Sequence, residues 1–217
     1  MTPDEEANRA QDAIDAGELG TALHHLAGAL SADPLRPRFL ELCDELFERL
    51  PDPIAATSPG ERPWFGEVAL HARALARDGR HTEAVHLLLQ IAAARPDVPY
   101  LTWALEWLDA PATAVDPEAL VPAFARLFER LPANEPGLQS VLAVLDPLCA
   151  SWSDPMLAWY RAVWLCQRAD PRGPAAAEEL LLRFPTFALA GDAAHPDAER
   201  ARVLLEAAKE HAGGLHG

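Results

Sequence analysis

The sequence predicts an all-α protein built from antiparallel helix pairs, and three observations support this. Apolar residues recur with the 3.6-residue period of a helix, as in Phe65, Val68, Ala72 and Leu75. Most of the 20 prolines fall between such periodic segments, where they end one helix and precede the next. No segment alternates apolar and polar residues for long enough to predict a strand.

The periodic segments give the expected order of elements. The longest expected loop runs from Pro51 to Pro63, and a short glycine turn, Asp78 to Arg80, joins two antiparallel helices. Helices are expected at residues 4–16, 19–32, 37–50, 64–78, 81–95, 98–109, 116–131, 136–150, 155–169, 174–184 and 196–212.

The hexapeptide LFERLP occurs twice, at Leu46–Pro51 and Leu127–Pro132. In both copies an arginine comes at the end of a helical stretch, where a cation meets the partial negative charge of the last carbonyls. A proline follows where the helix must stop. The motif therefore predicts a helix end, with its Leu and Phe residues in the core and its Glu residue exposed.

Composition limits the kinds of partner. The chain has 217 residues, half of them hydrophobic, which is enough for a sizeable core. Its formal net charge of -15 repels phosphate backbones and anionic lipids, so we expect neither nucleic acid nor membrane as a partner. The acidic N-terminus lacks the features of a secretory signal, which predicts a cytoplasmic protein. A single lysine among many Arg, Ala and Pro residues is typical of a GC-rich bacterial genome.

The three cysteines, Cys43, Cys149 and Cys166, are far apart in the sequence and surrounded by apolar residues. No CxxC motif is present. We therefore expect reduced core cysteines and no disulfide framework.

An internal repeat appears when the chain is shifted by 62 residues. Glycine in such a hairpin permits the turn, alanine permits close helix crossing, and proline ends the second helix. The coinciding pairs are Gly17 with Gly79, Ala22 with Ala84, His24 with His86, Leu26 with Leu88, Pro34 with Pro96 and Pro37 with Pro99.

Two stretches, Ala16–Pro34 and Arg77–Pro96, resemble the turn and second helix of the tetratricopeptide repeat (TPR) family. A third unit, Met156–Pro185, is more degenerate and gives no clean alignment. Ile91 departs from the pattern by replacing a small residue. The spacing of glycine, small, large, small and proline residues is met by Gly17, Ala22, Leu26, Ala29 and Pro34, and in part by Gly79, Ala84, Leu88 and Pro96.

The resemblance implies a TPR-like, partly degenerate α-solenoid of stacked antiparallel helix pairs, running as a single array over residues 1–217. Because the family repeat is about 34 residues long, the 62-residue shift leaves room for either a degenerate intervening repeat or an irregular helical array. A hinge is expected only in the loop at 51–63, and the tail at 213–217 is expected to be flexible.

Function follows from the same resemblance. Repeats of this family present a concave groove, lined by the first helix of each pair, that accepts a peptide or helix of another protein. The implied function is a protein–protein interaction scaffold or adaptor, not an enzyme. The groove positions carried over are Asn8, Gln11 and Asp15 in the first hairpin and Arg73 and Arg77 in the second.

Arg73, Arg77 and Arg80 form a basic cluster in a very acidic chain, and two interpretations remain open. Guanidinium groups recognise carboxylates, so the partner segment would be acidic. Alternatively, the arginines pair with neighbouring Asp and Glu residues on a solvated face.

Trp103 and Trp107, one helical turn apart, are secondary groove candidates. Aromatic residues anchor interfaces, but they also fill cores. The helix around them is apolar over most of its circumference, which favours burial.

No reaction is predicted. The histidine pairs His24/His25 and His81/His86 lack metal-ligand spacing, and no phosphate-binding glycine loop is present, so we expect no metal and no cofactor. Two alternatives to the scaffold remain: a helical enzyme, or the regulatory part of one, with an unidentified site, and a module that associates into a homodimer.

Overall fold

The computed structural model divides the chain into two compact units, Met1–Arg130 and Leu131–Gly217. Each unit is described by itself, and the expected hinge at 51–63 lies within the first. The structure describes residues 1–109, 115–116, 119–120, 122–124, 127, 142, 145–146, 148–150, 153–167, 170–184 and 206.

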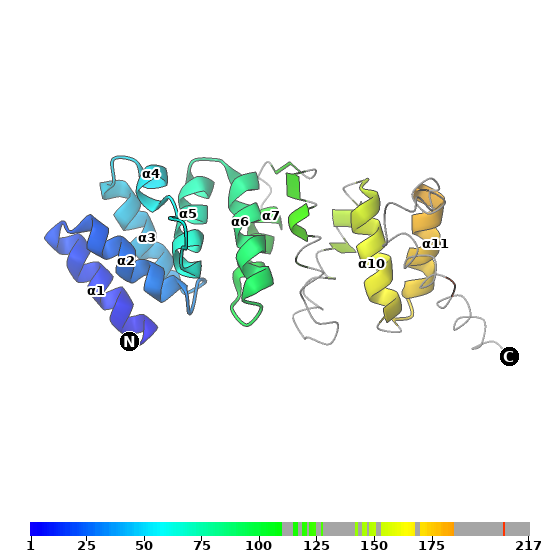
Figure 1. The fold of residues 1–217 in the computed structure, drawn as a ribbon, viewed down its shortest axis with the longest axis horizontal. Coiled ribbons are helices and arrows are strands. Elements are labelled where there is room, and N and C mark those ends of the chain that lie inside the picture. The colour runs from blue at the N-terminus through cyan, green and yellow to red at the C-terminus, as the bar shows by residue number, and fades with distance from the viewer. Residues whose placement is uncertain are drawn as a thin grey trace. The chain divides into compact units, whose positions relative to one another are not determined.

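The described residues form helices and no strands, which confirms the all-α prediction (Figure 1). The predicted helices at 116–131, 136–150 and 196–212 lie mostly outside the described residues. The helices whose bounds the structure gives in the first unit are α1 (Pro3–Ala16), α2 (Leu19–Leu30), α3 (Pro37–Arg49), α4 (Pro53–Thr57), α5 (Phe65–Arg77), α6 (His81–Ala94) and α7 (Tyr100–Asp109). In the second unit they are α10 (Pro155–Gln167) and α11 (Gly173–Arg183).

Helix α4 corrects the prediction of one uninterrupted loop at 51–63. The carboxylate of Asp52 accepts a hydrogen bond from the Ala55 amide at 3.0 Å, and Pro53 occupies the first turn. Five residues are too few to show a helical period, so the sequence pattern could not reveal this element.

The two predicted glycine turns are confirmed. Gly17 ends α1 with φ 77°, and Gly79 follows α5 with φ 83°. Both lie in the left-handed region that favours glycine. The next amide donates back into the helix in each case, from Glu18 to the Ala13 carbonyl at 2.8 Å and from Arg80 to the Leu75 carbonyl at 2.9 Å.

The helices pack as antiparallel neighbours, α1 with α2, α5 with α6 and α10 with α11, and α5 also packs against α2. A close approach of α5 to α2 occurs at Gly66, where an added Cβ would lie 1.8 Å from the Ala27 carbonyl oxygen. The Gly66 amide donates to Ser31 Oγ at 2.9 Å.

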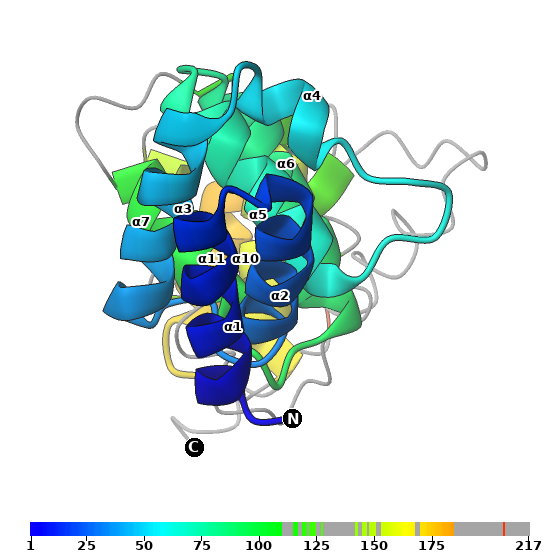
Figure 2. The same ribbon diagram turned by 90° about the vertical axis from the view of Figure 1, so that its left-hand side faces the viewer.

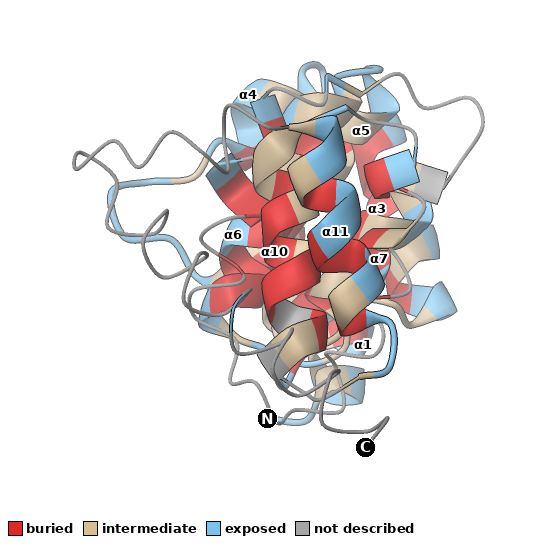
Figure 3. Ribbon diagram, turned by 90° about the vertical axis from the view of Figure 1, so that its right-hand side faces the viewer, coloured by how far each residue is buried: buried red, intermediate tan, exposed pale blue. Residues whose placement is uncertain are grey.

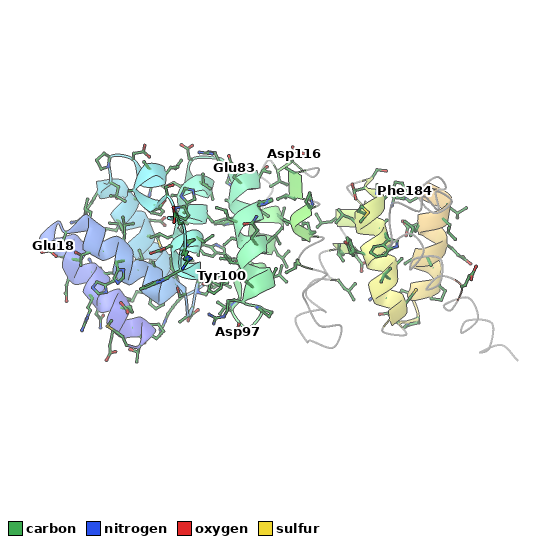
Figure 4. All side chains as sticks on the ribbon, in the orientation of Figure 1. Glu18, Glu83, Asp97, Tyr100, Asp116 and Phe184 are labelled. Atoms are coloured by element: carbon green, nitrogen blue, oxygen red, sulfur yellow. The ribbon has the colours of Figure 1, made fainter. Side chains whose placement is uncertain are left out.

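A continuous core joins α1, α2, α3 and α5. Tyr100 at the start of α7 is buried, and its hydroxyl donates to the Leu30 carbonyl at the end of α2 at 3.0 Å (labelled in Figure 4). Leu46 and Phe47 of the first LFERLP copy are buried and Glu48 is exposed, as predicted. Most of the second copy lies outside the described residues, although its Leu127 is buried.

Arginines at helix ends bind carbonyl groups of other segments. Arg49, the last residue of α3, donates to the Ile14 carbonyl near the end of α1 at 2.7 Å. Arg183, the last residue of α11, donates to the Cys149 carbonyl at 3.2 Å. The predicted pairing of a terminal cation with helix carbonyls therefore occurs, but between elements and not within one helix.

In the second unit, α10 carries buried residues along much of its length, whereas α11 exposes one side (Figure 3). Ion pairs tie these helices together. Arg161 binds Asp146 at 2.5 Å and Glu179 at 3.1 Å, and Arg172 binds Asp146 at 3.0 Å. Asp146 thus lies between two arginines.

All three cysteines are free, as predicted. Cys43 and Cys149 are buried and Cys166 is half-buried. Burial raises the pKa of the Cys43 thiol to about 12 and that of Cys149 to about 11, which disfavours the reactive thiolate.

Candidate functional site

The groove positions carried over from the repeat resemblance meet at α3. Asn8 accepts a hydrogen bond from Arg38 at 2.5 Å, and Gln11 donates to Glu45 at 3.4 Å. From the other side, Arg73 donates to Asp44 at 2.7 Å. We call this surface the α3 face, formed by Asn8, Gln11, Asp15, Arg38, Asp44, Glu45, Glu48, Arg73 and Arg77.

Four residues of the α3 face come from the predicted set on α1 and α5 that the 62-residue shift relates. Gln11 corresponds to Arg73, and both contact carboxylates of α3. Asp15 corresponds to Arg77; Asp15 accepts from Gln11 at 3.3 Å, and Arg77 donates to the Asp44 carbonyl at 3.2 Å. Helices α1 and α5 therefore present the equivalent residues Gln11 and Arg73 to the intervening α3, and of the second pair Arg77 contacts it.

Each arginine of the basic cluster has a carboxylate partner. Arg73 is paired with Asp44, and the nearest Arg77–Glu48 distance is 3.9 Å. Arg80 lies outside the α3 face and binds Glu83 through two bonds of 2.7 and 2.6 Å (Glu83 is labelled in Figure 4). These bonds raise the pKa of Arg80 and lower the pKa of Glu83. The structure therefore contains the local pairing that was one of the two interpretations.

Arg73 and Arg77 differ in how firmly they are held, which predicts different effects on stability. The Arg73 side chain is 19% exposed, and that of Arg77 is 42% exposed. We expect Arg73→Ala to lower the free energy of unfolding by about 1–2 kcal/mol, and Arg77→Ala to change it by less than about 0.5 kcal/mol. Urea unfolding measures both, and equal losses would contradict the distinction.

The two tryptophans of α7 also differ in burial. Trp103 is 2% exposed and belongs to the core, which leaves little of its side chain accessible to a ligand. Trp107 is half-buried, with its ring centroid 5.1 Å from that of Trp103. The apolar circumference of this helix correctly favoured burial.

A pocket that no sequence pattern predicted lies between α2 and α5. Its volume is about 340 Å³, at the small end of the range of ligand sites. The missed helix α4 and the loop after it form one wall, and this loop extends outward from the helices (Figure 2). We call it the α2–α5 pocket, lined by Gly20, Leu23, His24, Ala56, Thr57, Ser58, Pro59, Gly60, Glu67 and Leu70.

Glu67 holds the start of α5 next to the pocket. One of its carboxylate oxygens, Oε2, accepts from the Trp64 amide at 3.0 Å, as in a capping box. The Trp64 side chain is 52% exposed, and its ring centroid lies 5.1 Å from that of His24. An acidic group and two aromatic rings therefore lie together at this end of α5.

His71 of α5 contacts Thr57 of α4, on the wall of the pocket. Its Nδ1 lies 3.0 Å from Thr57 Oγ1, and Thr57 donates to the Pro53 carbonyl at 2.7 Å. Burial lowers the pKa of His71, with a further decrease from Arg80 and an opposing effect from Glu83. The folded protein therefore favours the neutral imidazole.

This shift predicts a pH dependence of stability. The unfolded chain binds a proton at His71 more readily than the folded protein does, so the stability contribution is complete above pH 6.5, the ordinary pKa. It is lost as the pH falls below 6.5 through the folded-state pKa. Urea unfolding across this range should show a steeper loss for the wild type than for His71→Asn. Identical slopes would contradict the prediction.

Among the described residues, no group of three or more His, Cys, Asp and Glu side chains is placed to hold a metal ion. His25 contacts Glu6 at 2.8 Å, and His86 contacts Gln90 at 2.7 Å. No helix in the described part of the chain is long and apolar enough to cross a membrane.

Comparison with known proteins adds no further assignment. No model of a protein family matches the chain, and neither a curated protein nor a solved structure matches it.

Proposed function

We propose that the protein is an interaction scaffold that holds a peptide or helix of a partner protein on the α3 face. The observation that carries the proposal is the meeting of repeat-related positions from α1 and α5 on α3. In the proposed TPR-like solenoid, α1, α3 and α5 are first helices of successive pairs, and α3–α4 is a degenerate pair whose second helix is reduced to five residues.

The polar character of the α3 face suits a reversible partner. Its arginines are paired with carboxylates of the same face, although Nε of Arg73 is buried and has no hydrogen-bond partner among the described residues. Arg77 is half exposed and only loosely paired, which leaves its guanidinium able to bind a carboxylate of an acidic segment. We therefore assign Arg77, rather than Arg73, as the residue that contacts the partner.

A matched pair of charge reversals tests this. Arg77→Glu changes a residue of the α3 face, and Arg62→Glu makes the same change in charge in the exposed loop before α5. Immobilised wild type and both variants are used to capture proteins from a lysate of the source organism. We expect a partner to be retained by wild type and Arg62→Glu and lost with Arg77→Glu.

Reversal at Arg73 is unsuited to this test, because a carboxylate there would face that of Asp44 and weaken the fold. Equal capture by Arg77→Glu and wild type would contradict the assignment of Arg77. Capture of nothing but the same chain would favour self-association instead.

A further inference from the structure

The α2–α5 pocket carries an inference that is independent of the α3 face. Its charge is one-sided, because Glu67 is the one acidic residue among those lining the pocket and no arginine or lysine is present. The chain as a whole has a formal charge of -15, which adds to the attraction for a cation. The pocket therefore has the electrostatic character of a site for a positively charged group.

Glu67 retains capacity to bind such a group. Its Oε2 accepts the Trp64 amide, and in the described part of the chain no hydrogen bond to Oε1 is present. An ionised carboxylate can accept several hydrogen bonds, and those from a cation are among the strong ones. A cationic head in the pocket can therefore bind Glu67 without breaking the helix cap.

The other walls fit an aliphatic stem. Leu23 of α2, Leu70 of α5, and Ala56 and Pro59 beside α4 provide apolar contacts. A volume of about 340 Å³ is small for an organic cofactor but sufficient for one long side chain. Arginine and lysine combine an apolar stem with a charged head in this way.

Trp64 provides an exposed aromatic surface next to the pocket that suits contact with another protein. It is one of three large hydrophobic residues that are exposed in the described part of the chain, with 52% of its surface accessible. Its ring contacts that of His24, which lines the pocket. Exposed tryptophans are enriched at the centres of protein interfaces, and their rings attract cations.

We propose that the α2–α5 pocket binds an arginine or lysine side chain of a partner protein, with Glu67 as its counter-charge and Trp64 as the adjoining contact. A basic segment bound here and an acidic segment bound at the α3 face would be two separate attachments. Failure of either site leaves the other untouched.

A titration followed by amide chemical shifts in NMR tests the pocket directly. The probe is a short end-blocked glycine peptide with one central arginine, and the matched probe replaces arginine by citrulline, its uncharged isostere. The variant Glu67→Gln removes the charge while retaining an acceptor for the Trp64 amide. Glu61→Gln, in the exposed loop before α5 and outside the pocket lining, controls for net charge.

We expect saturable shifts of the Leu23, Thr57 and Gly60 amides with the arginine peptide, for wild type and Glu61→Gln alike. The affinity of Glu67→Gln for the arginine peptide should be roughly ten-fold or more below that of the wild type. The affinity of the wild type for the citrulline peptide should fall by a similar factor. Shifts spread over the acidic surface, equal binding of the citrulline peptide, or unchanged affinity in Glu67→Gln would each overturn the proposal.

Discussion

Replacing Gly66 with alanine is expected to lower the free energy of unfolding by about 3 kcal/mol or more. The added methyl group would lie 1.8 Å from the Ala27 carbonyl oxygen and 2.5 Å from Ser31 Oγ. The carbonyl is backbone within α2, so relief requires α5 to move away from α2. That movement would also stretch the hydrogen bond from the Gly66 amide to Ser31. Urea unfolding followed by far-UV circular dichroism measures the loss.

The same substitution at Gly20 is the control. Gly20 lies in α2, and nothing is within 4 Å of an added Cβ there. Because alanine favours the helix over glycine, we expect Gly20→Ala to raise the free energy of unfolding by about 0.5–1 kcal/mol. If Gly66→Ala were as stable as Gly20→Ala, the close crossing of α2 and α5 would be wrong.

Trp103→Ala is expected to lower the free energy of unfolding by about 3–5 kcal/mol, because it leaves a cavity where a buried indole was packed. Trp107→Ala should lower the free energy of unfolding by about 1–2 kcal/mol, since that side chain is half-buried and already borders solvent. Both variants lose the contact between the two rings, so the difference between them reports burial alone. Thermal unfolding of the two variants and the wild type measures it.

Equal effects of the two tryptophan substitutions would contradict the assignment of Trp103 to the core. A stable Trp103→Ala variant that no longer bound its partner would instead support a role of Trp103 in binding. The pair therefore distinguishes a role in stability from a role in binding.

Helix ends could be predicted because they depend on local chemistry. Gly17 and Gly79 have positive φ values that glycine adopts without strain, so each marks a turn in the sequence as clearly as in the structure. Arg49 was expected at the end of α3 for a similarly local reason. Its bond to the Ile14 carbonyl of α1 was not, because it depends on how two helices pack.

The α2–α5 pocket could not be predicted for two reasons. Helix α4 is too short for periodicity to detect, and it forms one wall of the pocket. The second reason is the crossing at Gly66, which brings α5 against α2. A glycine near the start of a helix does not show in the sequence which other helix packs against it. Both features depend on contacts distant in sequence.

The sequence predicted part of the α3 face, namely its residues on α1 and α5. The 62-residue shift relates Gln11 to Arg73, and the structure turns both toward α3. Their carboxylate partners, including Asp44, lie on α3 in the segment that the shift leaves unmatched. The repeat therefore indicated which side of α1 and α5 to examine, and pairing of the arginines with nearby carboxylates was one of the two interpretations, but the shift did not indicate that the partners would come from α3.

Site-specific photo-cross-linking in the source organism tests whether the α3 face binds another protein. A photoreactive residue is placed at Glu48, a position on the α3 face whose side chain is 70% exposed, and in a second variant at the exposed Gln90 of α6. If the α3 face holds a partner, cross-links to another protein form from position 48 and not from position 90. Cross-links from position 90 alone, or from both positions only to a second copy of this chain, would contradict it.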